Sequence, residues 1–150
     1  MPAALAAAKI EGMNQALVTT RVAEAMHPGT ITCPPETPLA DVARMMAAYS
    51  IHCVVVLADV DEADFEGRLW GVVSDLDLVE AAATADLEER TAGGTAASPL
   101  VTVPPDESLE RAAQLMAENG TAHLVVVDPA SDRPVGVLST LDVARVLARR

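Results

Sequence analysis

The stretch Thr32-Cys33-Pro34-Pro35-Glu36-Thr37-Pro38-Leu39 decides the fold of this chain, because the chain contains it twice. The second copy is Thr102-Val103-Pro104-Pro105-Asp106-Glu107-Ser108-Leu109. Aligned without gaps, Thr32 to Leu57 and Thr102 to Val127 are identical at 9 of 26 positions. A repeat of this length predicts two similar supersecondary units, neither of which buries its apolar face alone.

A second repeated block follows in each copy. Gly71-Val72-Val73-Ser74-Asp75-Leu76-Asp77 corresponds to Gly136-Val137-Leu138-Ser139-Thr140-Leu141-Asp142. These blocks are 65 residues apart, whereas the first blocks are 70 apart, so the first copy carries an insertion of five residues between Ala58 and Leu69. The segment around the insertion is acidic, and we expect a solvent-exposed loop there.

The composition limits the class of protein. Hydrophobic residues make up 51% of the 150 residues but aromatic residues only 2%, so we expect one domain with an aliphatic core. The net charge of −12 disfavours a nucleic-acid-binding surface, because phosphate neutralisation supplies most of that affinity. No apolar run is long enough to span a bilayer, and Ala3–Ala8 lacks the preceding basic segment of a signal peptide. Two cysteines are too few for a disulfide scaffold, so we expect a cytoplasmic protein.

The spacing of apolar residues predicts the order strand, helix, strand, strand, helix in each copy. Helical spacing begins at Leu39 and at Leu109, and we expect Thr37 to cap the first of these helices. The last helix of each copy begins at Ser74 or Ser139. A flexible link, Thr91 to Thr95, is expected between the copies. The expected strands are Thr30–Thr32, Cys53–Leu57, Leu69–Val73, Leu100–Val103, Leu124–Val127 and Val135–Leu138.

This arrangement resembles a tandem cystathionine-β-synthase (CBS) domain pair, also called a Bateman module. The resemblance rests on Thr-x-x-Pro followed by Leu, on an apolar strand ending at Val127-Asp128, and on Gly-x-x-Ser-x-x-Asp in both copies. It covers Val22 to Arg149, so we expect a stand-alone module. The expected boundaries are an N-terminal helical extension at 1–21, a first repeat at 22–90 with the acidic loop at 58–69, and a second repeat at 91–150.

The resemblance implies an α/β (α+β) fold in which two pseudo-symmetric β-α-β-β-α repeats pack as one module. Members of the family commonly hold adenosine-containing ligands in the clefts between repeats, usually regulate an enzyme or transporter, and pair through their helices. It therefore predicts a regulatory sensor that binds an adenosyl small molecule, forms a homodimer and acts on a protein partner. No cofactor is required, and no membrane or nucleic-acid partner is expected.

The residues with the clearest chemistry are Asp77 and Asp142. A ribose presents two adjacent hydroxyl donors, and one carboxylate can accept both. Ser74 and Ser139 lie three residues earlier at a helix start, where a hydroxyl and free backbone N–H groups can bind a phosphate. The alternative is that Ser-x-x-Asp is a capping box that only starts a helix.

In the family, each cleft combines the Ser-x-x-Asp of one repeat with residues of the other repeat. On that pattern Ser139 and Asp142 meet Thr37, Ile51 and His52. Ser74 and Asp77 meet Glu107, Thr121, Ala122 and His123. Ile51 or Thr121 would lie against the adenine, which needs apolar cover.

Departures from the family pattern set the expected ligand. Glu107 stands where the first copy has Thr37, and its charge would repel a phosphate in the Asp77 site, which favours the Asp142 site for an anionic nucleotide. No Lys or Arg stands at the strand starts, where the histidines supply at most partial charge. We therefore expect AMP or S-adenosylmethionine rather than ATP.

Other functions are less well supported by the residues. His27, Cys33, His52, Cys53 and His123 are metal-ligand types, but their spacing contains no Cys-x-x-Cys or paired-His element, so no metal site is expected. No sequence element places a base beside a nucleophile, so we do not expect an enzyme. The alternative from a different class is a ligand-free homodimeric adaptor.

Overall fold

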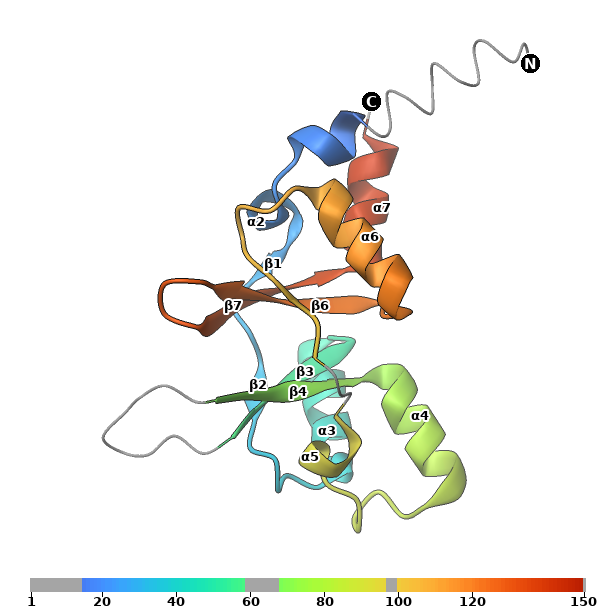
Figure 1. Cartoon of the computed structure of the whole chain (residues 1–150). Helices are drawn as coiled ribbons and strands as arrows, with labels where there is room; N and C mark the ends of the chain where they lie inside the picture. Colours follow the sequence, from blue (N-terminus) through green and yellow to red (C-terminus); the bar gives the residue numbers. More distant parts are fainter. Residues whose placement is uncertain (1–14, 59–67, 97–99, 150) are drawn as a thin grey trace, which may run out of the picture. The chain divides into compact units, whose positions relative to one another are not determined.

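The computed structural model describes residues 15–58, 68–96 and 100–149. The chain forms two compact units (Figure 1). Unit 1 comprises Met1–Gly29 and Val101–Arg150, and unit 2 comprises Thr30–Leu100. Each unit contains one β-α-β-β-α repeat, so the predicted α+β class and repeat order are confirmed.

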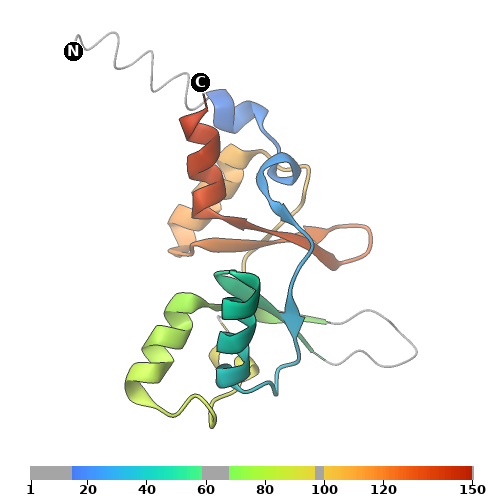
Figure 2. The ribbon, with the colours of Figure 1, turned by 180° about the vertical axis from the view of Figure 1, so that it is seen from behind.

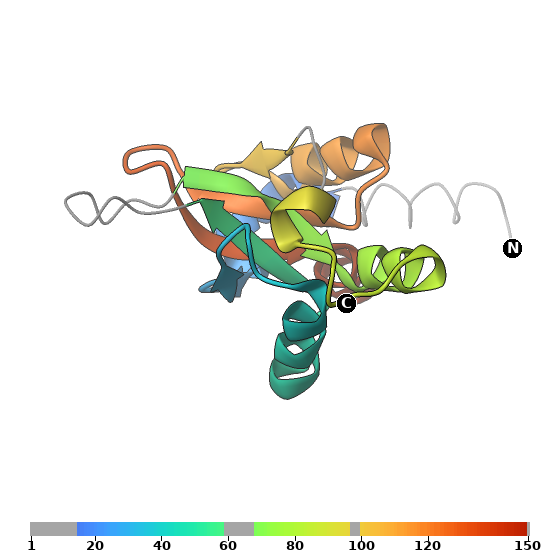
Figure 3. The ribbon, with the colours of Figure 1, turned by 90° about the horizontal axis from the view of Figure 1, so that it is seen from below.

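Unit 2 is built on a three-stranded sheet in the order β2-β3-β4. Strand β3 pairs with β2 in parallel and with β4 in antiparallel, and Cys53 lies opposite Ser74. Seen from behind, α3 lies in front of these strands (Figure 2), and α4 continues beyond the end of β4 (Figure 3). The elements are β2 (Thr32–Cys33), α3 (Leu39–Tyr49), β3 (Cys53–Ala58), β4 (Arg68–Ser74), α4 (Asp75–Thr84) and α5 (Ala92–Thr95).

Unit 1 repeats this plan with one further strand, in the order β1-β7-β6-β5. Strand β7 pairs in antiparallel with β6 and with β1, and His27 of β1 lies opposite Val137. Helices α2, α6 and α7 lie on one side of the sheet (Figure 1). The elements are α2 (Val22–Ala25), β1 (His27–Pro28), β5 (Thr102–Val103), α6 (Leu109–Asn119), β6 (His123–Asp128), β7 (Arg133–Ser139) and α7 (Thr140–Ala148).

The two cores are aliphatic and occupy corresponding positions. In unit 2, Leu39 and Val42 of α3 pack with Val54, Val56 and Val73 of the sheet. The equivalent positions in unit 1 are Leu109, Ala112, Leu124, Val126 and Leu138, which also share one core. Burial of such side chains contributes about 1.5–3 kcal/mol each, which compensates for the lack of aromatic residues. All of Cys53–Val56 and Leu124–Val126 are buried, as predicted for strands covered on both faces.

Two local predictions need correction, and one short strand was missed. Pro38, not Thr37, is the N-cap of α3; it is extended at φ −61° and ψ 143° and gives no side-chain cap. The expected flexible link is ordered, because Thr91 caps α5 and Ala92 is fully buried. Strand β1 was not predicted, because two residues are too short to show a periodic pattern.

The boundary between the compact units differs from the expected boundary of the first sequence repeat, which begins at residue 22. Val22–Gly29 belongs to unit 1, since the Val22 amide donates to the Glu107 carbonyl at 2.9 Å and β1 pairs with β7. The expected N-terminal extension is described only from residue 15, and 15–19 is helical. The acidic loop lies outside the described residues from 59 to 67.

Not every apolar helix residue faces a core. Leu76 and Val79 of α4 and Leu141 of α7 are 61%, 66% and 52% exposed. These helices therefore carry apolar side chains on their outer faces in the single chain. In the described parts of the chain, no helix is both long and apolar enough to cross a membrane.

Candidate functional site

Both Ser-x-x-Asp segments form complete capping boxes. Ser74 Oγ accepts from the Asp77 amide at 3.2 Å, while Asp77 Oδ2 accepts from the Ser74 amide at 2.8 Å. Ser139 and Asp142 repeat both distances. Both segments therefore cap their helices, and each box fixes a carboxylate at the third position of a helix that directly follows a strand.

Asp142 is held by more groups than Asp77. Its side chain is only 2% exposed, and Oδ2 also accepts from Ser139 Oγ at 2.9 Å. Its other oxygen, Oδ1, lies 3.1 Å from His27 Nε2 and 3.4 Å from Arg145 Nη1. A buried carboxylate needs such partners, because burial without them strongly disfavours the charge.

The starts of β3 and β6 lie beside the Ser-x-x-Asp segment of their own repeat. The Asp75 amide donates to the His52 carbonyl at 2.9 Å, and the Thr140 amide to the Ala122 carbonyl at 3.0 Å. In unit 2, His52 Nδ1 is also 2.8 Å from Asp75 Oδ2. In unit 1, Thr121 Oγ1 donates to the His123 carbonyl at 3.0 Å.

The other predicted site residues have structural contacts in their own units. Ile51 is half-buried against the unit 2 core, and the Thr37 carbonyl accepts from the Ala92 amide at 2.8 Å. Glu107 Oε1 accepts from the Ser108 amide at 2.9 Å, next to the N-cap of α6. The expected groups that combine residues of both repeats remain predictions.

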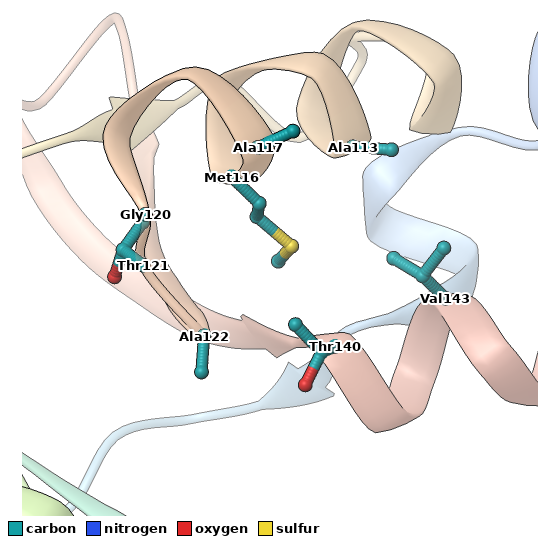
Figure 4. Close-up of a pocket in the computed structure, with 8 residues that line it drawn as sticks. All are labelled: Ala113, Met116, Ala117, Gly120, Thr121, Ala122, Thr140 and Val143. Carbon is teal, nitrogen blue, oxygen red and sulfur yellow. The ribbon is translucent and has the colours of Figure 1, made fainter.

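Unit 1 contains an apolar pocket of about 440 Å³ between α6, the start of β6 and α7 (Figure 4). Two predicted site residues, Thr121 and Ala122, line it. At the corresponding place in unit 2, the pair His52–Asp75 occupies the positions of Ala122 and Thr140. The two repeats therefore differ at this point. The lining residues are Ala113, Met116, Ala117, Gly120, Thr121, Ala122, Thr140 and Val143.

Both cysteines are buried, free thiols. Burial, together with the charge of Asp75, raises the pKa of Cys53 to about 12. Burial also raises the pKa of Cys33, against the effect of a hydrogen bond with Thr37. Within residues 15–58, 68–96 and 100–149, no three His, Cys, Asp or Glu side chains come together as a metal site.

Sequence reasoning missed two groups on Asp142. Arg145 stands three residues after Asp142 on one helix, so the spacing alone contained that signal. His27 had no such signal. It reaches Asp142 only because β1 pairs with β7, more than one hundred residues away in the chain.

The fold and the repeated Ser-x-x-Asp helix starts define a module of two β-α-β-β-α repeats, and the chain belongs to the CBS domain family. The family matches residues 22–84 and 95–149, which covers both repeats. This agrees with the resemblance seen in the sequence.

Three known proteins illustrate the similarity. The magnesium transporter MgtE of Thermus thermophilus is 44% identical over 73 residues, which are 47% of this chain and 15% of the transporter. The CBS domain protein PAE2072 from Pyrobaculum aerophilum, solved with AMP, is 28% identical with a TM-score of 0.71, over 82% of this chain and 89% of that one. The CBS domain pair of protein MJ0100, solved with 5′-methylthioadenosine and S-adenosylmethionine, is 23% identical with a TM-score of 0.72. The match covers 85% of this chain and 94% of that one.

Proposed function

We propose that this protein is a regulatory sensor that binds an adenosine-containing ligand through Asp77 and Asp142. The observation that carries the proposal is the repeated placement of a carboxylate at the third position of α4 and α7, fixed by a capping box. A fixed carboxylate can accept hydrogen bonds from both hydroxyls of a ribose without losing side-chain entropy on binding. The AMP complex of PAE2072 supports the class of ligand.

The proposed sites combine the two repeats as the family does. Ser74 and Asp77 work with Thr121, Ala122 and His123, and Ser139 and Asp142 work with Thr37, Ile51 and His52. In each site the Ser cap and its helix N-terminus face the phosphate, and Ile51 or Thr121 covers the adenine. The pocket beside Thr121 and Ala122 supplies apolar surface for such a ring.

The proposed ligand is AMP or S-adenosylmethionine rather than ATP. The strand starts carry His52 and His123 but no Lys or Arg, and the chain has a net charge of −12. A triphosphate would meet this negative field with few cations to neutralise it. We propose that the protein is not an enzyme, works in the cytoplasm and passes its signal to a protein partner, as a homodimer paired through its repeat helices.

Thermal unfolding with AMP, S-adenosylmethionine, ADP and ATP tests the proposal. A ligand at about 100 times its dissociation constant should add roughly 2.7 kcal/mol and raise the melting temperature by about 5–10 °C. The double variant Asp77→Asn with Asp142→Asn should lose this shift, because the neutral amides keep a capping oxygen but lose the charged ribose acceptor. Glu80→Gln removes a charge from the same helix α4 and should retain the shift.

The second candidate is a ligand-free adaptor. It is favoured by the complete capping boxes, which give both Ser-x-x-Asp segments a structural role, and by the exposed apolar residues of α4 and α7. If no adenosyl compound shifts the melting temperature of the wild-type protein, the sensor proposal is wrong and the adaptor remains.

A further inference from the structure

We propose that the two carboxylates are unequal and that His27 is an internal occupant of the Asp142 site, so that the ligand takes Asp77 first. Binding at Asp142 then requires the His27 imidazole to leave Oδ1. This inference rests on the proposed function, since it assigns the order in which the two sites are used. It reverses the order expected from Glu107, because that charge acts only on the phosphate in the Asp77 site, whereas the ribose acceptor positions of Asp142 are already in contact with protein groups.

Three hydrogen bonds and one close histidine contact surround the Asp142 carboxylate. An ionised carboxylate offers about four lone-pair sites, two on each oxygen. Oδ2 accepts from the Ser139 amide at 2.8 Å and from Ser139 Oγ at 2.9 Å. Oδ1 faces His27 Nε2 at 3.1 Å and Arg145 Nη1 at 3.4 Å. A ribose diol needs two acceptor positions, so it must displace groups of the protein at Asp142.

The Asp77 carboxylate has fewer hydrogen-bond partners than the Asp142 carboxylate. Among the described residues, the hydrogen-bond donor on its carboxylate is the Ser74 amide, at 2.8 Å on Oδ2. Ser74 Oγ makes its contact to the Asp77 backbone rather than to the carboxylate. The residue after Ser74 is Asp75, which pairs with His52. Asp77 therefore has lone pairs for a diol before any contact of the described protein is broken.

Exposure decides which group leaves Asp142. The Ser139 contacts belong to a capping box whose loss would also uncap α7. The side chains of His27 and Arg145 are 66% and 56% exposed, so water can replace their contacts. His27 is on the two-residue strand β1 and makes the shorter contact of the two. Its imidazole is therefore the group that sets the affinity of this site.

Isothermal titration with AMP tests this in a protein that carries Asp77→Asn, so that only the Asp142 site remains. Adding His27→Ala should tighten AMP binding on the order of ten-fold, because the 3.1 Å contact between His27 Nε2 and Asp142 Oδ1 no longer has to be broken. His27→Gln keeps a donor near the place of Nε2 and should restore weak binding. Arg149→Ala removes a cation at the end of α7, the helix that carries Asp142. Arg149 makes no contact with Asp142, so this variant should leave AMP affinity unchanged.

The outcomes separate this inference from the proposed function. If His27→Ala weakens AMP binding or leaves it unchanged while the wild-type protein binds AMP, His27 is a ligand contact or a bystander, and only this inference is wrong. If Asp77→Asn leaves wild-type affinity intact, the order of the two sites is wrong. If the wild-type protein binds no AMP, the proposed ligand class and this inference fail together.

Discussion

At the scale of single residues, the serine of each capping box makes two contacts with the aspartate three residues later. Ser74 contacts the Asp77 amide through Oγ, and its own amide donates to the Asp77 carboxylate. In the second repeat, Ser139 Oγ also donates to the buried Asp142 carboxylate. The two serines therefore have unequal roles, although the sequence around them is nearly the same.

Replacing these serines by alanine should reveal the difference in stability. Ser74→Ala should cost about 0.5–2 kcal/mol, as for a lost N-cap. Ser139→Ala should cost more, because it also removes a hydrogen bond from a buried charge. Urea unfolding of the two variants checks this, and equal losses would contradict the distinction.

The thiol of Cys53 should be unreactive in the folded protein. Its pKa is raised to about 12 by burial and by Asp75, so hardly any thiolate exists at neutral pH. In the unfolded chain the thiol ionises near pH 9.0. Because only the unfolded chain loses this proton between pH 9.0 and about 12, the free energy of unfolding should fall as the pH rises through that range.

Cys33→Val isolates Cys53, because valine is the residue of the second repeat at that position. This variant should react slowly with a disulfide reagent when folded and rapidly in guanidinium. Prompt stoichiometric labelling of the folded protein would show that Cys53 is accessible.

The residue-level predictions from sequence were accurate where the signal was local. Ser74 and Ser139 were predicted as helix starts because the cap and its partner are three residues apart. Thr37 was assigned one position too early, since a residue before proline is restricted to extended backbone and proline itself became the cap. His27 on Asp142 was beyond sequence reasoning, because no local pattern encodes a contact made through strand pairing.

At the scale of elements, the pairing of β1 with β7 requires a glycine. A Cβ on Gly136 would lie 2.5 Å from the His27 carbonyl oxygen, which is backbone and cannot turn away. The close approach explains why a glycine is needed at this point of a strand.

Gly136→Ala should therefore displace β1. We expect a loss on the order of 1–3 kcal/mol, as for overpacking. We also expect faster hydrogen exchange at the Gly29 amide, which donates to the Val135 carbonyl at 2.9 Å. Retained protection at Gly29 would show that β1 does not depend on this approach.

The long elements were predictable and the short ones were not. The strands β3 and β6 were predicted within one residue at each end and the starts of helices α3 and α6 were predicted correctly, because each has a periodic or continuous apolar pattern. The four-residue helix α5 was expected to be a flexible link. It is stabilised instead by contacts from other elements, including a hydrogen bond of 3.0 Å from Trp70 Nε1 to the Gly93 carbonyl.

At the scale of the whole molecule, the exposed apolar side chains of α4 and α7 are the feature that a single chain leaves unexplained. Leu76, Val79 and Leu141 are each more than half exposed. Exposed apolar surface of this kind marks an interaction face on each helix, and we propose that a second copy of the chain covers both.

Substitution of the exposed apolar residues of α4 and α7 should change the oligomeric state. Leu76→Glu together with Leu141→Glu should convert a dimer to a monomer in sedimentation equilibrium, since it places charge in an apolar interface. Thr84→Glu adds a charge at the exposed end of α4 and should leave the dimer intact. A wild-type protein that sediments as a monomer would contradict the proposed homodimer.

The most direct test of the central claim is a crystal structure of the protein with AMP. We predict a ribose whose two hydroxyls donate to the Asp77 carboxylate, with His27 still in contact with Asp142 when only one AMP is bound. AMP bound away from both carboxylates would contradict the assignment of Asp77 and Asp142 as ribose acceptors. AMP bound first at Asp142, with His27 in place, would contradict the proposed order of the two sites.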